Sequence, residues 1–256
     1  MTGTLYLVPN TLDFGVASVD AGGSLPNLQD VLPLGVIRIA ARLPCWVAEN
    51  AKTTRAFLKR VNEVVPLSQP VQAISIVELP RAQKGAAGSQ PPRLDALLAP
   101  ALAGQDIGLI SEAGLPAVAD PGAALVQVAH ALALRVEPLS GPSSLMLALA
   151  ARGLNGQSFA FVGYLPVGAA ERTARIRELE ALSRRAQQTQ LMIETPYRNA
   201  ALLSALLGAL NGSTRLSVSC GLTLAPGWSR SDNMADWKAK PTSIPNDTPA
   251  VFCLLA

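Results

Sequence analysis

Short apolar runs that alternate with longer helical patterns are the feature that most constrains the fold of this 256-residue chain. Buried strands are predicted at 5–8, 36–40, 74–79, 107–111 and 135–139. Helices are predicted at 48–64 and 123–134. This alternation is typical of a parallel α/β sheet.

A second set of elements begins near Ser140. A helix at 143–152 precedes strands predicted at 159–162, 190–194, 216–220 and 250–254, with helices at 170–185 and 199–210 between them. The chain is long enough for two cores. We therefore predict two α/β domains, residues 1–139 and 140–256.

Composition excludes several classes of protein. Charged residues make up 15% of the chain and apolar residues 49%, which favours a well-buried core. The net charge of +3 is too small to indicate a nucleic-acid partner by itself. Three widely spaced cysteines without a CxxC pair predict neither disulfides nor a zinc site. The single histidine, His130, lies inside a helical pattern, so mechanisms that need a histidine base are disfavoured.

Targeting signals and turn chemistry give three further expectations. No run of 18 apolar residues and no charged leader segment is found, which predicts a cytoplasmic protein without a membrane span. Residues 80–95 are rich in Gly, Pro and Ala, and a lid and a disordered segment both fit this composition. Asp120-Pro121-Gly122 predicts that Asp120 caps the helix that follows, with proline at its first position.

The best-known phosphate-binding and hydrolase motifs are missing: the chain has no GxGxxG after its first strand, and no GxxxxGK[ST], HExxH or GxSxG anywhere. Two small-residue loops remain, at 111–116 and 140–144, each following a predicted strand. Parallel sheets bind ligands beyond the carboxyl ends of their strands, and Gly114 and Gly141 would let a ligand approach the backbone. Turn chemistry with a helix cap explains the same residues equally well.

The longest motif is Leu-Ile-Ser-Glu-Ala-Gly-Leu-Pro-Ala-Val-Ala-Asp-Pro-Gly at 109–122. It resembles the L-I-S-D-A-G-T-P-x-I-S-D-P-G signature of the rRNA small subunit methyltransferase I family, a branch of the S-adenosylmethionine-dependent tetrapyrrole methylases. Residues 135–144, 161–166 and 194–198 are similar to that family's R-V-x-P-L-P-G-P-x-A, Y-E-G-F-L-P and E-S-P-H-R motifs. The opening run, 5–9, resembles its first strand.

This resemblance implies two α/β domains with S-adenosylmethionine bound in the cleft between them, and a homodimer. It places cofactor contacts at Pro9, Ala113, Gly114, Leu115, Pro116, Ala119, Ser143, Ser144, Gly163, Tyr164, Leu165 and Pro166. The activity it implies is 2′-O-methylation of ribose in 16S rRNA, with ribosomal RNA or the small ribosomal subunit as partner. No metal is expected.

The chain departs from the family outside these motifs. Thr-Leu-Asp-Phe at 11–14 replaces P-I-G-N, Glu-Asn-Ala-Lys at 49–52 replaces E-D-T-R, and Gly-Leu-Thr-Leu at 221–224 replaces E-L-T-K. These losses keep two alternatives open. One is a methyltransferase that acts on a tetrapyrrole or another small molecule, and the other is a degenerate paralogue that binds the cofactor without catalysis.

Methyl transfer from a sulfonium depends mainly on positioning, while a ribose hydroxyl also needs help in losing its proton. Glu49, Lys52 and Arg198 are the catalytic candidates, although a solvated helix face or a carbonyl cap explains them as well. Arg172, Arg175 and Arg177 are candidates for RNA contacts on the helix at 170–185. An expected Glu171–Arg175 pair would instead make this an ordinary solvated face.

Overall fold

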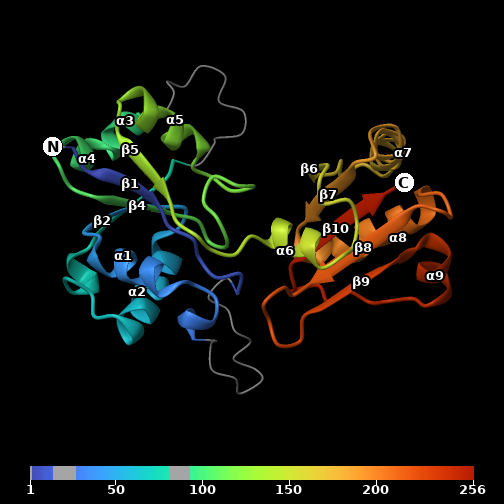
Figure 1. Ribbon diagram of the computed structural model, residues 1–256, viewed down its shortest axis with the longest axis horizontal. Helices are drawn as coiled ribbons and strands as arrows, with labels where there is room; N and C mark the ends of the chain where they lie inside the picture. Colours follow the sequence, from blue (N-terminus) through green and yellow to red (C-terminus); the bar gives the residue numbers. More distant parts are fainter. Residues whose placement is uncertain (1, 14–26, 81–92) are drawn as a thin grey trace. The chain divides into compact units, whose positions relative to one another are not determined.

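A computed structural model describes residues 2–13, 27–80 and 93–256, so most of the predicted loop at 80–95 lies outside the described residues (Figure 1). The chain divides into two compact units, Met1–Pro142 and Ser143–Ala256. Each unit has its own five-stranded sheet.

The first unit is built on a fully parallel sheet with strand order β3-β2-β4-β1-β5. Its strands are β1 (Thr4–Leu7), β2 (Cys45–Ala48), β3 (Ser75–Glu78), β4 (Ile107–Ile110) and β5 (Arg135–Pro138). Its helices are α1 (Leu34–Arg42), α2 (Ala51–Val64), α3 (Leu94–Leu97), α4 (Ala99–Leu102) and α5 (Ala123–Ala131), with 3-10 turns η2 (Leu28–Asp30) and η3 (Val71–Ala73).

Apolar clusters cover both faces of this sheet. Side chains of α1 and α2 pack on one face around Trp46, while α4 and α5 pack on the other around Val47. Neighbouring residues of β2 thus point to opposite faces, as the strand period of two requires. The central strand β4 is entirely apolar and buried, as expected for a strand covered on both faces, whereas the edge strands β3 and β5 are more exposed and contain charged residues.

The strand predicted at 36–40 is wrong, because these residues lie in α1. Val36, Ile37, Ala40 and Ala41 are buried, which is a helical spacing, and a short apolar run does not distinguish a helix from a strand by itself. The strand that belongs in this position is β2, and the sequence pattern missed it. The following helix begins at Ala51 instead of residue 48, because Asn50 caps it by accepting hydrogen bonds from the N–H groups of Lys52 and Thr53.

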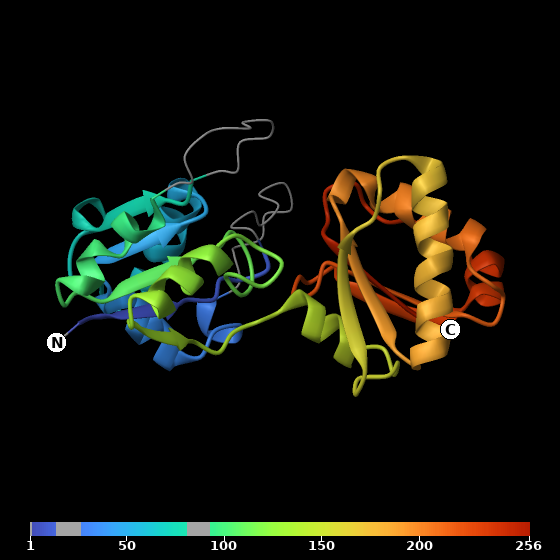
Figure 2. The same ribbon diagram turned by 90° about the horizontal axis from the view of Figure 1, so that it is seen from above.

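The second unit contains a mixed sheet with strand order β6-β7-β10-β8-β9, in which only β6 and β7 are parallel. Its strands are β6 (Phe159–Tyr164), β7 (Thr189–Glu194), β8 (Arg215–Cys220), β9 (Trp228–Asn233) and β10 (Ala250–Leu255). Its helices are α6 (Ser144–Ala150), α7 (Ala169–Ala186), α8 (Asn199–Ala209) and α9 (Met234–Ala239), with the 3-10 turn η4 (Pro196–Arg198). The apolar side chains of α7, α8 and α9 pack on one face of the sheet and those of α6 on the other, and Figure 2 shows α7 running along its face.

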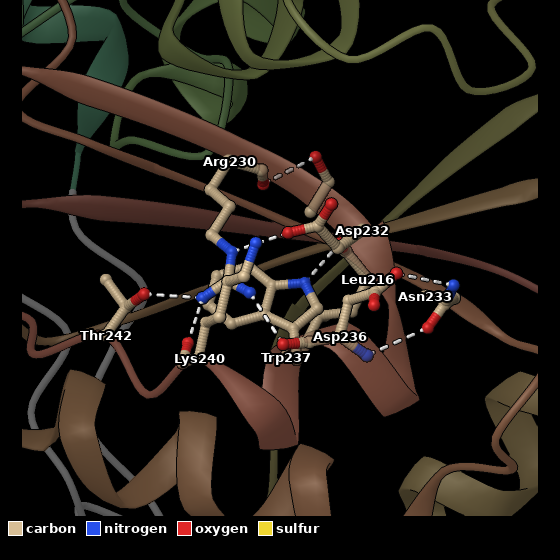
Figure 3. Close-up of polar contacts among 9 residues, drawn as sticks. Leu216, Arg230, Asp232, Asn233, Asp236, Trp237, Lys240 and Thr242 are labelled. Atoms are coloured by element: carbon tan, nitrogen blue, oxygen red, sulfur yellow. Dashed lines mark hydrogen bonds and ion pairs between the residues drawn. The ribbon is translucent and has the colours of Figure 1, made fainter.

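The edge of this sheet, formed by β9 with α9, was not predicted from the sequence. Arg230 of β9 makes the side-chain contacts that connect the two elements (Figure 3). The guanidinium of Arg230 lies 4.0 Å from the ring centroid of the buried Trp237. It donates to the carboxylate of Asp232 and to the backbone carbonyl of Lys240. The indole N–H of Trp237 donates to Leu216 of the neighbouring strand β8. Side-chain contacts of Arg230 and Trp237 thus connect the polar strand β9 to the short helix α9. The residues that make these contacts follow no periodic pattern in the sequence.

Candidate functional site

Three loops meet at the carboxyl edge of the parallel sheet, after β1, β4 and β5. The N–H of Asn10 donates to the carbonyl of Gly114 at 2.8 Å, joining the first loop to the second. A Cβ atom at Gly141 would lie 2.2 Å from the Cβ of Pro9, so the third loop passes the first at a distance that only glycine allows. The two small-residue loops singled out in the sequence are therefore brought together, with Pro9 between them.

Asn10 organises this junction, although the sequence analysis did not single it out. Its side-chain amide donates to the carbonyls of Ser111 (3.2 Å) and Glu112 (3.0 Å), and its side-chain oxygen accepts from the N–H of Thr11. Asn10 is 6% exposed, so these bonds form away from water. A polar residue two positions after the predicted strand at 5–8 was the available signal.

The loop that contains the long motif has an unusual backbone. Gly114 and Gly122 have φ values of 67° and 128°, and Ala117 and Ala119 have φ values of 66° and 62°. Alanine in the left-handed region is uncommon and costs free energy, so the fold over-determines this conformation. Among the predicted cofactor contacts in this unit, Pro9, Gly114 and Pro116 are buried, Ala113 and Leu115 are half-buried and Ala119 is exposed.

Three carboxylates gather at the same edge. Glu49 directly follows β2, and its Oε2 accepts the N–H of Glu112 at 2.9 Å. Burial and the neighbouring charges of Glu49 and Glu112 raise the pKa of Asp120 from its usual 3.8 to about 6, although a hydrogen bond with Ser111 opposes the rise. Glu49 is thus a member of the site, and it lies just before the helix instead of within it, since α2 begins two residues later than Glu49.

The predicted helix-capping role of Asp120 is also wrong. The cap of α5 is Gly122, whose positive φ turns the chain into the helix, and Pro121 lies before the helix. The side chain of Asp120 is engaged by Ser111 instead. Its carboxyl group therefore interacts with Ser111 and with the neighbouring charges of Glu49 and Glu112, and does not cap a helix.

A buried ion pair fixes the loop after β1. Arg60 of α2 donates through both terminal nitrogens to the two oxygens of Asp13, at 3.2 and 3.1 Å. Thr11 donates to the same carboxylate at 2.6 Å. The three residues are 2–9% exposed, and no sequence signal linked them. Thr11 and Asp13 lie in the stretch where the sequence departs from P-I-G-N.

In the second unit, Ser143 caps α6 by accepting a hydrogen bond from the N–H of Met146, and Ser144 is the first residue of that helix. The turn at 163–166 has Gly163 at φ 72°, an exposed Tyr164 and a buried Leu165. Pro166 is half-buried. Their predicted contact with a cofactor remains a prediction.

The predicted cationic residues have different surroundings. Lys52 is exposed on α2. Nη2 of Arg198 lies 2.9 Å from Oε2 of the buried Glu194, which gives Arg198 a structural task as the counter-ion at the end of β7. The expected Glu171–Arg175 pair is wrong, because Arg175 pairs with Glu178 at 2.7 Å.

The other two arginines of α7 also differ. Arg172 donates to the carbonyl of Val167 ahead of the helix, and Arg177 is exposed. Only Arg177 of the three therefore points freely to solvent in the described part of the chain.

Sequence reasoning also missed a small pocket at the β8–β9 turn, with a volume of about 170 Å³. It is lined by Gly221, Leu222, Thr223, Leu224, Gly227, Trp228 and Ser229. Thr223 has a φ of 68°, which is a strained conformation for a β-branched residue. This turn occupies the position of the altered E-L-T-K motif.

Among the described residues, no cluster of three or more His, Cys, Asp or Glu side chains could hold a metal ion. A search of the same residues for a long apolar helix that could span a membrane found none.

Comparison with known proteins adds relatives with a named activity. No family model matches the chain. It is 39% identical over 137 residues to ribosomal RNA small subunit methyltransferase I of Mesorhizobium japonicum, covering 54% of this chain and 44% of the relative. The corresponding Pseudomonas aeruginosa protein is 38% identical over 112 residues, covering 44% of this chain and 38% of the relative.

The chain is similar to the ribosomal RNA small subunit methyltransferase I family. The resemblance inferred from the motifs is thereby confirmed. A longer match, 28% identical over 221 residues, joins 86% of this chain to 65% of the methyltransferase I of Halalkalibacterium halodurans. The chain spans less than half the length of the first two relatives, and the weaker identity over the longer match agrees with the departures outside the motifs.

Solved structures confirm the fold class. A conserved hypothetical protein from Aeropyrum pernix K1 matches with a TM-score of 0.60 and 17% identity, covering 100% of this chain and 85% of that one. A cobalt precorrin-4 methyltransferase matches with a TM-score of 0.56 and 12% identity, covering 98% and 94%. Uroporphyrin-III C-methyltransferase from Thermus thermophilus, crystallised with S-adenosylhomocysteine, matches with a TM-score of 0.55 and 18% identity, covering 99% and 97%. The chain has the two-unit α/β fold of the tetrapyrrole methylases.

Proposed function

We propose that this protein is an S-adenosylmethionine-dependent methyltransferase that methylates a ribose 2′-hydroxyl of 16S rRNA. The observation that carries the proposal is the 33–39% identity to relatives named ribosomal RNA small subunit methyltransferase I. By the same resemblance we propose that the protein acts in the cytoplasm as a homodimer.

The junction of the three loops fits this cofactor. Gly141 lets the loop after β5 pass close to Pro9, and Gly114 adopts a φ of 67° beside Leu12 and Pro142, so both glycines shape the junction at which we propose that the cofactor binds. The carboxylates of Glu49, Glu112 and Asp120 favour a ligand with a positive centre. We propose that the cofactor contacts Pro9, Ala113, Gly114, Leu115, Pro116 and Ala119 here, and Ser143, Ser144, Gly163, Tyr164, Leu165 and Pro166 in the second unit.

When bound, S-adenosylmethionine supplies an activated methyl group on a cationic sulfur, which leaves as a neutral thioether. The chain must then place the ribose oxygen in line with that methyl group and accept the hydroxyl proton. Glu49 and Asp120 are the carboxylates at the edge that can take this proton. Lys52 and Arg198 supply positive charge for the developing alkoxide in this proposal.

Ligand binding tests the cofactor. S-adenosylhomocysteine at about one hundred times its dissociation constant should stabilise the protein by roughly 2.7 kcal/mol. For a chain of this size the melting temperature should then rise by about 5 to 10 °C. NAD and ATP should give no rise, and a larger rise with either of them would contradict the assignment.

A Gly114→Leu variant tests the place of binding, because a branched side chain beside Leu12 and the carbonyl of Pro142 would alter the loop that we propose contacts the cofactor. Gly208→Leu is the size-matched control, since Gly208 lies in α8 with open space around it. Isothermal titration should show loss of binding only for Gly114→Leu, with circular dichroism confirming that both variants fold.

The acceptor is tested by incubating the protein with labelled cofactor and either protein-free 16S rRNA or small subunits, followed by mass spectrometry of the nucleosides. Methyl groups on a ribose oxygen support the proposal. Transfer to a tetrapyrrole alone would favour the small-molecule alternative, and cofactor binding without transfer to any acceptor would favour the degenerate paralogue.

A further inference from the structure

Three cations form a row on the solvent face of α2: Lys52, Arg55 and Lys59, here called the α2 row. Their spacing of three and four residues places them on one side of the helix. The buried residues of the helix, including Phe57, Leu58 and Val61, lie on the opposite side. All three cations are exposed, and their side chains have no hydrogen-bond or ion-pair partner among the described residues.

Helix stability does not account for this row. The first turn of α2 has no acidic residue and its last turn has no basic residue, which reverses the arrangement that the helix dipole favours. Lys52 lies in the first turn, where a positive charge costs about 0.3 to 1 kcal/mol. Residues that break a local rule without a compensating contact mark sites of function.

Neighbouring elements do not neutralise the row. Helix α1, which packs beside α2 on the same face of the sheet, has no acidic residue and adds the exposed Arg38 (Figure 1). The carboxylate of Glu78 in β3 accepts a hydrogen bond from the N–H of Ala51, the first residue of α2, and forms no ion pair with the row among the described residues. Glu63 is the only acid within α2 and lies one turn beyond Lys59, at the end away from the candidate site.

The row begins at the candidate site. Glu49, whose carboxylate accepts the N–H of Glu112, lies three residues before Lys52, and Asn50 between them fixes the start of the helix. From Lys52 to Lys59 the helix rises about 10 Å, a length over which one nucleic-acid strand carries about three phosphates. A strand that follows the row therefore arrives at the carboxylates and the three-loop junction.

We propose that the α2 row binds the phosphate backbone of the RNA substrate and leads the strand to the candidate site. This inference rests on the proposed function and names the surface that holds its substrate. The arginines of α7 are less suited to the task, since Arg172 is bound to a backbone carbonyl and Arg175 to Glu178. An exposed, unpaired cation gains the full benefit of a phosphate partner without first losing another contact.

The test compares two triple variants of the full chain, each of which removes three positive charges. One is Lys52→Ala with Arg55→Ala and Lys59→Ala, and the control is Arg184→Ala with Arg185→Ala and Lys238→Ala, three exposed residues of α7 and α9. Alanine has the highest helix propensity, so the altered helices should persist, and circular dichroism verifies this. Binding of protein-free 16S rRNA is measured by fluorescence anisotropy over a series of KCl concentrations.

Each single-strand phosphate contact contributes about 0.7 to the slope of log affinity against log salt. The α2 variant should therefore lose up to about two units of slope and bind up to about a hundredfold more weakly at 0.1 M salt. The control variant, whose residues are not among the candidates for RNA contacts, should keep the slope and affinity of the unaltered protein. An unchanged α2 variant, or an equal loss in both variants, would overturn the proposal.

Two further measurements distinguish a failure of the α2-row proposal from a failure of the proposed function. Titration with S-adenosylhomocysteine should give equal affinity for the unaltered protein and the α2 variant. If the cofactor binds but the α2 variant retains its RNA affinity, the proposal that the α2 row binds RNA is wrong, and the proposed function stands. If RNA binding depends on the row while no cofactor binds, the proposed function fails alone. Tighter binding to phosphatidylserine vesicles than to rRNA would overturn RNA as the partner.

Discussion

At the scale of single residues, the site combines features that the sequence showed with features that depend on the folded chain. Gly114 and Gly141 could be predicted, because glycine between a strand and a helix signals a close approach of backbones. The environment of Asp120 could not be predicted from the sequence. Its pKa depends on burial and on the charges of Glu49 and Glu112, which only the parallel sheet brings to its side.

Asp120 gives a prediction about pH. Because the pKa of the folded state is raised, the folded protein binds this proton more tightly than the unfolded chain, so the free energy of unfolding falls as pH rises from about 4 to 6. The rise to about 6 corresponds to about 3 kcal/mol, which partial solvent exposure reduces to about 1 to 2 kcal/mol. Asp120→Asn should therefore stabilise the protein by that amount at pH 7.5 and leave it unchanged at pH 4.

Urea unfolding at the two pH values measures this difference. Asp30→Asn is the control, since Asp30 is exposed on η2, and it should change stability at neither pH. A destabilised Asp120→Asn at pH 7.5 would show that the ionised carboxylate is needed for the loop, contrary to the prediction.

At the scale of elements, short β-rich runs between helical patterns located most of the strands but missed β2 and β9. The strands predicted at 74–79, 107–111 and 135–139 overlap β3, β4 and β5, although only β4, in the middle of the sheet, is an apolar strand buried throughout. The strand β9 has the polar sequence Trp-Ser-Arg-Ser-Asp-Asn, and Arg230 stabilises it through contacts distant from the strand itself. No periodicity can indicate such a strand.

Arg152, just beyond α6, yields a prediction at this scale. It is 3% exposed, its Nε donates to the carbonyl of Ala148, and its two terminal nitrogens have no hydrogen-bond partner in the described chain. Burial lowers the pKa of this guanidinium, which reflects the cost of an uncompensated charge. Arg152→Met keeps an unbranched apolar side chain but removes the charge, and should raise the free energy of unfolding by about 1 to 3 kcal/mol.

Arg215→Met is the matched control, because Arg215 is exposed and donates to the neighbouring Gly153, and its effect should stay within about 0.5 kcal/mol. Urea unfolding measures both variants. A marked loss of stability in Arg152→Met would indicate that the guanidinium has a partner that the contacts among the described residues do not include.

At the scale of the whole molecule, the sequence predicted two α/β parts, but not the mixed character of the second sheet. Antiparallel pairing of β10 with β7 and β8 depends on long connections whose direction apolar runs do not reveal. Each sheet nevertheless takes all its strands from one unit, and apolar clusters cover both faces of each sheet from the same unit. The covalent link at 142–143 is therefore dispensable for either core.

We predict that residues 1–142 and 143–256 each fold when produced separately, since either is long enough to bury an independent core. Tryptophan fluorescence reports each fragment: Trp46 is buried in the first, and Trp237 is buried in the second beside Arg230. Both fragments should emit at short wavelength in buffer and shift cooperatively to longer wavelength in urea. Trp237→Phe in the second fragment should remove most of its shift, because Trp228 is only half-buried. Emission typical of exposed tryptophan without urea, in either fragment, would mean that the two cores depend on each other.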